Sequence, residues 1–164
     1  MADEADGIVE AGREAAADVI ELIHRVFDEY GFIWDPEDEF WDLLGDEYPY
    51  TPPQGQLWVM RNEAGTVVGS IAVELLDDGA AELHRLYLDA ELRGRGLGWA
   101  LLRSGEQWAA QAGCERVVLW SDTRFADAHR LYERGGYERT GERSLTDVNA
   151  TVEWRYERVL RRNG

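Results

Sequence analysis

The segment that most constrains the fold of this chain runs from Glu82 to Gly98, where an apolar strand pattern passes through a turn into an amphipathic helix. Glycine leaves backbone N–H groups unshielded, and the first turn of a helix carries partial positive charge. Arg93 and Arg95 add fixed charge to the same turn, which contains three alternate glycines, Gly94, Gly96 and Gly98. The segment therefore predicts a loop that holds a phosphate group at the start of a helix near Leu97.

The spacing of these glycines distinguishes between the known types of phosphate-binding loop. A P-loop places Lys followed by Ser or Thr after its second glycine, and no Lys follows here. A dinucleotide fingerprint would place glycine at position 99, which is Trp99 in this chain. The pattern that remains, Arg93-x-x-Gly96-x-Gly98, resembles the pyrophosphate loop of the GCN5-related N-acetyltransferases (GNAT), which binds coenzyme A.

A second segment of the chain, residues 128–137, reads AHRLYERGGY. It resembles the A-x-x-L/F-Y-E-x-x-G-F/Y motif of the same family and follows the loop at the expected distance. The two motifs span about residues 80–141, and the elements before and after them complete the pattern of the fold. The resemblance therefore implies a single GNAT domain over residues 1–164.

The resemblance also implies which residues bind the coenzyme. Backbone groups on the strand before the loop would bind the pantetheine arm, and amides of the loop would hold the pyrophosphate. Family members commonly have Asn three residues before the motif alanine, where this chain has Phe125, so either Asp122 or Ser121 supplies that polar contact or the contact is absent. The predicted coenzyme-binding residues are Leu86, Tyr87, Leu88, Arg93, Gly94, Arg95, Gly96, Leu97, Gly98, Trp99, Asp122 and Phe125.

Transfer from a thioester to an amine requires a base for the amine and an acid for the leaving thiolate. By resemblance, Tyr132 occupies the position of the acid; otherwise it packs its helix onto the sheet. Glu82 lies eleven residues before Arg93, where one branch of the family carries its glutamate base; otherwise it is a strand carboxylate that faces solvent. His84 is two residues further on, hence on the same strand face, and either shares or replaces that function or is structural.

The amino-acid composition limits the kinds of partner that this chain can bind. Acidic residues outnumber basic ones by 33 to 17, the net charge is −16, and the chain has no Lys. This balance argues against a nucleic-acid partner, and the acids reflect either adaptation to high salt or steering of cationic substrates. No apolar run is long enough to span a membrane and the N-terminus is acidic, so we expect a cytoplasmic protein. Cys114, the single cysteine, precedes an apolar run and is expected to be a buried thiol.

Hydrophobic periodicity predicts the remaining elements. Together they give an α/β fold, with a twisted mixed sheet flanked by helices in the GNAT order βααβββαβαββ. A bulge is expected in the last strand, because its alternation is only roughly of period two. The expected strands are residues 8–11, 57–61, 67–75, 81–88, 116–120, 137–143 and 151–160. The expected helices are residues 16–27, a short second helix that starts after Asp35-Pro36 and includes residues 40–44, and residues 97–112 and 128–134.

The segment from Phe32 to Tyr50 is aromatic and acidic, and by resemblance it belongs to the region that selects the substrate. Its side chains either line a pocket for a cationic amine or divide between the core and solvent. The resemblance implies an acetyl-CoA-dependent N-acetyltransferase in which an amine of a small molecule or peptide attacks the thioester directly. It implies no metal, and dimerisation is common among relatives. The alternative is a coenzyme A-binding sensor or interaction module without turnover.

Overall fold

A computed structural model describes residues 7–160 of the chain. The strands are β1 (Ile8–Ala11), β2 (Gly55–Arg61), β3 (Val67–Leu75), β4 (Ala80–Leu88), β5 (Arg116–Asp122), β6 (Glu138–Ser144) and β7 (Val152–Val159). The α-helices are α2 (Ala16–Tyr30), α3 (Pro36–Glu39), α4 (Trp41–Leu44), α5 (Leu97–Gln111) and α6 (Ala126–Arg134), and the 3₁₀ turns are η1 (Arg13–Ala15) and η2 (Ala90–Leu92). No helix of the described residues is both long and apolar enough to cross a bilayer.

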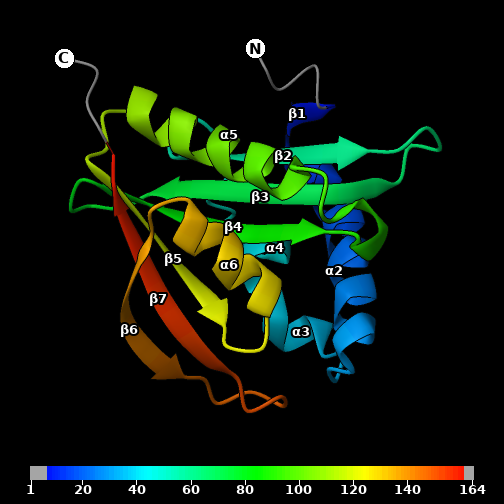
Figure 1. Ribbon diagram of the computed structural model, residues 1–164. Coiled ribbons are helices and arrows are strands. Elements are labelled where there is room, and N and C mark those ends of the chain that lie inside the picture. The colour runs from blue at the N-terminus through cyan, green and yellow to red at the C-terminus, as the bar shows by residue number, and fades with distance from the viewer. Residues whose placement is uncertain (1–6, 161–164) are drawn as a thin grey trace.

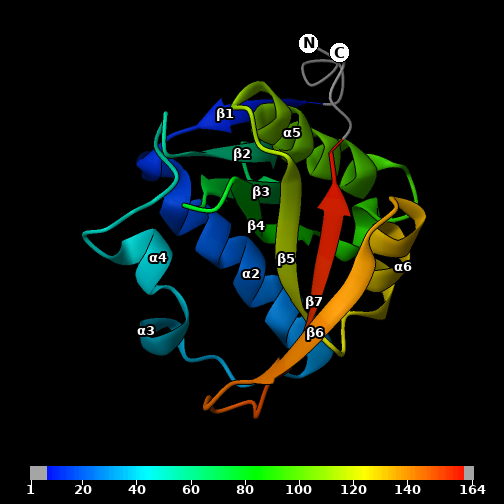
Figure 2. The same ribbon diagram turned by 90° about the vertical axis from the view of Figure 1, so that its left-hand side faces the viewer.

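The strands form one mixed sheet of seven in the order β1-β2-β3-β4-β5-β7-β6. Helices α5 and α6 cover one face, and α2, α3 and α4 cover the other (Figures 1 and 2). Each face has its own apolar core, because the strand side chains alternate between the two helical layers. Leu83 belongs to the core beneath α5, whereas Leu57 belongs to the core beneath α2.

The sheet opens at its centre, between β4 and β5. These strands run parallel and pair only over residues 80–83 and 116–119. Beyond Leu83 the two strands diverge, so backbone groups of β4 that point toward β5 have no strand partner there. Along the other edge of β4, the register with β3 shifts between Ser70 and Ala72. Arg85 forms the bulge on β4, with a φ of 57°, a left-handed conformation that is rare for residues other than glycine.

The order of elements predicted from the sequence is confirmed, and so are the buried thiol of Cys114 and the mixed α/β fold. The second expected helix is divided into the single turns α3 and α4, which meet at Phe40. The bulge expected in the last strand is wrong: the register of the β6–β7 pair shifts between Arg139 and Gly141, so the extra residue belongs to β6. The irregular pattern of β7 arises because it pairs with both β5 and β6.

Candidate active site

The opening between β4 and β5 is a cleft with a volume of about 1790 Å³. Both helical layers contribute to its walls: α5 and α6 on one side, and α2, α3 and α4 on the other. The loop between β6 and β7 adds a further wall through Leu145 and Asp147. The cleft therefore connects the glycine-rich loop with the acidic segment at residues 38–50, and it is large enough for two substrates side by side.

The glycine loop lies at the start of α5, as the sequence predicts. Gly94 and Gly96 each have a φ of 79°, and a Cβ at either position would meet nothing within 4 Å. A Cβ at Gly98 would lie 3.5 Å from Leu131 of α6, an ordinary van der Waals contact, so this position has room for a small side chain. No side chain of the described residues caps the start of α5. The first N–H groups of this helix are therefore available to an anion in the cleft.

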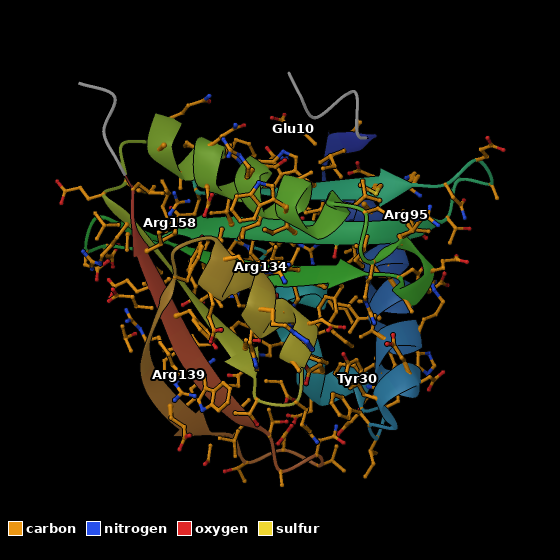
Figure 3. All side chains as sticks on the ribbon, in the orientation of Figure 1. Glu10, Tyr30, Arg95, Arg134, Arg139 and Arg158 are labelled. Atoms are coloured by element: carbon orange, nitrogen blue, oxygen red, sulfur yellow. The ribbon has the colours of Figure 1, made fainter. Side chains whose placement is uncertain are left out.

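The arginines around this loop differ in their partners. Arg93 forms two hydrogen bonds with the carboxylate of Glu29 on α2 and donates to the carbonyl oxygen of Leu88 at 2.9 and 3.2 Å. Its charge is balanced within the protein. Arg95, which is exposed in the loop, and Arg134 on α6, which lines the cleft, have no ion pair among the described residues (Figure 3). These two guanidinium groups are the ones free to meet phosphate groups.

Tyr132 on α6 lines the cleft with a side chain that is 5% exposed. Burial raises the pKa of its hydroxyl, and repulsion from Tyr87 and Tyr156 adds to the shift. The hydroxyl therefore stays protonated across the working range of pH. A buried, protonated hydroxyl beside the expected position of the thioester is suited to donate a proton.

Glu82 and His84 lie on the same face of β4, as predicted. This is the face opposite the α5 core, and the structure adds Glu74 of β3. Glu74 lies directly across from Glu82 in the β3–β4 pair. The Nε2 atom of His84 is 2.9 Å from Oε1 of Glu74 and 2.6 Å from Oε2 of Glu82. Two carboxylates at directly opposed positions repel each other, and a protonated imidazole between them relieves that repulsion.

This arrangement sets the charge of the cluster formed by Glu74, Glu82 and His84. Burial disfavours the imidazolium, but the hydrogen bonds to the two carboxylates outweigh burial and raise the pKa of His84 to about 9. Burial also disfavours the Glu82 carboxylate, yet His84 holds the pKa of that group below its usual range. At neutral pH the cluster carries one net negative charge and becomes a base only when His84 loses its proton.

A buried ion pair joins the next residue of β4 to α4. Arg85 donates to Asp42 at 2.6 and 3.2 Å and to the carbonyl oxygen of Glu39 at 2.8 Å. The hydroxyl of Tyr50 donates to the same carboxylate at 2.7 Å. Burial alone would raise the pKa of Asp42, but these donors hold it below its usual range. The bulge therefore directs the Arg85 side chain toward the short helices, and the ion pair with Asp42 holds these helices beside His84.

Asp42→Asn is expected to lower the free energy of unfolding by about 2 kcal/mol, because it leaves a buried guanidinium without its anion. Urea denaturation at neutral pH measures the change. The matched control is Asp38→Asn, which also replaces a carboxylate by an amide but at an exposed position on α3. It is expected to change the free energy of unfolding by less than about 0.5 kcal/mol. Equal stabilities of the D42N and wild-type proteins would show that Arg85 does not hold α4.

The residues expected to replace the missing Asn have partners within the protein. Asp122 is buried and accepts hydrogen bonds from Arg124 at 2.7 and 2.9 Å. Ser121 lies 3.2 Å from Nε2 of His129. Phe125 packs edge-on against Tyr30 of α2, with ring centroids 4.9 Å apart. The structure brings all three beside the cleft, but the two polar side chains are already engaged.

Sequence reasoning missed Glu74, Arg85 and Arg134. The sequence does carry a signal for Glu74, because Glu74 and Glu82 are equidistant from Asp78, which lies between the strands predicted at residues 67–75 and 81–88. Arg134 lies one turn after Arg130 on α6, and only the course of α6 along the cleft reveals its exposure there. Nothing in the sequence signals a bulge at Arg85, since its conformation is one that glycine usually adopts.

Comparison with known proteins now decides the family. The model of the acetyltransferase (GNAT) family matches residues 19–137. The chain belongs to the GNAT family. An uncharacterised N-acetyltransferase of Schizosaccharomyces pombe is 31% identical over 120 residues, which are 73% of this chain and 74% of that protein. An N-acetylaspartate synthetase of Danio rerio is 34% identical over 102 residues, which cover 62% of this chain but only 36% of that protein.

Solved structures share the GNAT fold along nearly the whole chain. A GNAT acetyltransferase from Staphylococcus aureus has a TM-score of 0.80 at 22% identity and covers 94% of this chain and 98% of its own. A proposed acyl-CoA N-acyltransferase from Klebsiella pneumoniae has a TM-score of 0.66 at 25% identity, with 93% and 96% covered. These findings support an acyltransferase with an acyl-CoA cosubstrate, and the open loop, the uncapped helix and the unpaired β4 backbone fit such a molecule.

Proposed function

We propose that this GNAT protein transfers an acetyl group from acetyl-CoA to a primary amine. The cluster of Glu74, His84 and Glu82 carries the proposal, because it supplies a base inside the cleft, within reach of an amine acceptor. The acyl-CoA would lie between β4 and α6, with its phosphates at residues 94–99 and its pantetheine arm along Leu86, Tyr87 and Leu88. The carbonyl of Leu88 is occupied by Arg93, so the remaining backbone groups of β4 would make these contacts.

In the proposed reaction, the amine nitrogen attacks the thioester carbonyl and the bond from carbon to sulfur breaks. His84, when neutral, accepts the proton that the amine loses, and the two glutamates stabilise the imidazolium that results. Tyr132 donates its hydroxyl proton to the departing sulfur. The proposed transfer is direct, without a covalent bond to the protein. Cys114 is buried and is not among the residues that line the cleft.

The test of this proposal combines binding with turnover. We expect calorimetry to show one acetyl-CoA bound per chain, and we expect release of free thiol only when an amine is present. Tight binding without amine-dependent release, across a broad panel of amines, would favour the coenzyme A sensor. Absence of binding would contradict the assignment of the loop at residues 94–99.

Arg134→Gln is expected to weaken acetyl-CoA binding by about tenfold, because an Arg–phosphate contact contributes roughly 1.5 kcal/mol. The loss should shrink as salt is added, since salt screens an exposed charge pair. Arg103→Gln is the matched control: it removes the same charge from an exposed site on α5 that does not line the cleft. Equal affinities of the two variants would remove Arg134 from the proposed site.

A further inference from the structure

A second group of carboxylates lies in the same cleft, on elements that the base cluster does not use. Glu39 is at the end of α3, Asp147 is in the loop between β6 and β7, and Glu153 is on β7; all three line the cleft. They are close enough to interact: burial raises the pKa of Glu39, and the negative charges of Asp147 and Glu153 add to the shift against the pull of Arg85. Carboxylates from three segments thus converge on one wall.

The cations on this wall do not balance its anions. Arg85 is shared between Asp42 at 2.6 Å and Glu39 at 3.5 Å. Arg143 is bound to Glu153 at 2.7 Å. The carboxylate of Asp147 has hydrogen bonds only from the backbone and hydroxyl of Thr151, at 2.7 and 2.5 Å, within the described part of the chain. Two guanidinium groups therefore face four carboxylates.

Arg124, the next cation along the wall, also interacts with the charge of Asp147, but together with Asp122 it leaves the net charge unchanged. Arg124 is committed to Asp122, with its Nη2 atom 2.7 Å from Oδ2 of that carboxylate. The wall therefore keeps an excess of two negative charges, in addition to the negative charge of the base cluster. A ligand that enters this part of the cleft meets anionic groups at both places and, among residues 7–160, no unpaired cation.

Adaptation of the surface to salt does not account for this wall. Acids that serve solvation are exposed, as Glu37 and Asp38 are on the same short helix. The side chains of Glu39 and Glu153 are only 35% and 17% exposed. Half-buried carboxylates without a full set of cations are unfavourable in the free protein, and a cationic ligand relieves that cost.

We propose that the acyl acceptor is an amine with a second positive charge, bound with its reactive nitrogen at the cluster of Glu74, His84 and Glu82 and its other cationic group at Glu39 and Asp147. This inference rests on the proposed function. Trp41 and Leu145 also line the cleft and are exposed, so they offer apolar contact to a hydrocarbon chain that joins the two charges. The wall also disfavours acceptors with a carboxylate, including α-amino acids, because each of its described cations is already paired.

The test compares three amines of equal chain length: an α,ω-diamine, the matching alkyl monoamine and the matching ω-amino acid. We expect kcat/KM to be at least about tenfold higher for the diamine than for the monoamine, and lowest for the amino acid. Molar salt should reduce this preference, because it screens the second ion pair. Equal kcat/KM values for the diamine and the monoamine at low salt would overturn the inference while leaving the acetyltransferase proposal intact.

Two variants distinguish the effect of Glu39 on acceptor preference from the effect of the overall negative charge of the chain. Glu39→Gln is expected to lower the ratio of diamine to monoamine kcat/KM by about tenfold, mainly through the KM for the diamine. Glu37→Gln removes the same charge from an exposed position outside the cleft and should leave the ratio unchanged. Equal ratios in the two variants would overturn the role of Glu39, and Asp147→Asn then tests the second carboxylate. If acetyl-CoA binds but no amine is consumed, the proposed function fails and this inference fails with it.

Discussion

Tyr132→Phe is expected to lower kcat by about 10²-fold, with the KM for acetyl-CoA changed by less than about twofold. The phenol is a proton donor in the proposed reaction, and a departing thiolate without one leaves more slowly. The substitution keeps the ring that packs against Tyr137 and Tyr156, so the fold and the shape of the cleft remain. Steady-state release of thiol from acetyl-CoA with a saturating amine measures the effect.

Tyr137→Phe is the matched control for this loss. Its hydroxyl is also buried and donates to Glu106 at 2.7 Å, but Tyr137 does not line the cleft. We expect its kcat to stay within about twofold of the wild-type value. A Y132F protein with full kcat would show that Tyr132 only packs α6 onto the sheet, which is the structural alternative that the sequence leaves open.

His84→Gln is expected to lower kcat/KM by about 10²-fold at pH 9 and to remove the rise of activity with pH. In the wild-type protein the pKa of His84 is raised to about 9, and the base is the deprotonated form. Activity should therefore increase from neutral pH and level off above about pH 9. The pH profile of kcat/KM, measured with one amine throughout, tests this expectation.

The Glu74→Gln variant tests the direction of the pH shift in the same experiment. Removing one of the two carboxylates that stabilise the imidazolium lowers the pKa of His84, so the rise in activity should move to lower pH. The pKa of the amine itself does not change between the two proteins, and the difference between their profiles therefore belongs to the cluster. Identical profiles for the wild-type, E74Q and H84Q proteins would exclude His84 as the base and return that role to Glu82 alone.

The sequence predicts the fold well because its strongest signals are local. Glycines at 94, 96 and 98 predict a turn into a helix, and the segment 128–137 follows this turn at the distance expected for the family. Glu82 and His84 could be placed on one face because side chains alternate along a strand. The sequence does not predict the division of the second helix, because α3 and α4 are each a single turn held by Arg85 and not by their own periodicity.

The features of the site that the sequence does not predict depend on tertiary contacts. The partner of Arg93 is Glu29, which lies on a helix far away in the sequence, so a residue expected to supply free charge proves to be paired. The carboxylates of Glu39 and Asp147 come together only because the β6–β7 loop and α3 border the same cleft. Cytoplasmic location, dimerisation and halophilic adaptation remain predictions from the sequence.

Transfer of a labelled acetyl group tests the central claim most directly. The protein is incubated with acetyl-CoA carrying carbon-13 in both acetyl carbons, first alone and then with the amine that gives the fastest release of thiol, and the masses of the amine and of the protein are measured. We expect the labelled acetyl group on the amine, free coenzyme A in equal amount, and no added mass on the protein at any stage. A labelled protein formed before the amine is added, or an amine that never gains the label, would contradict direct transfer by this GNAT protein.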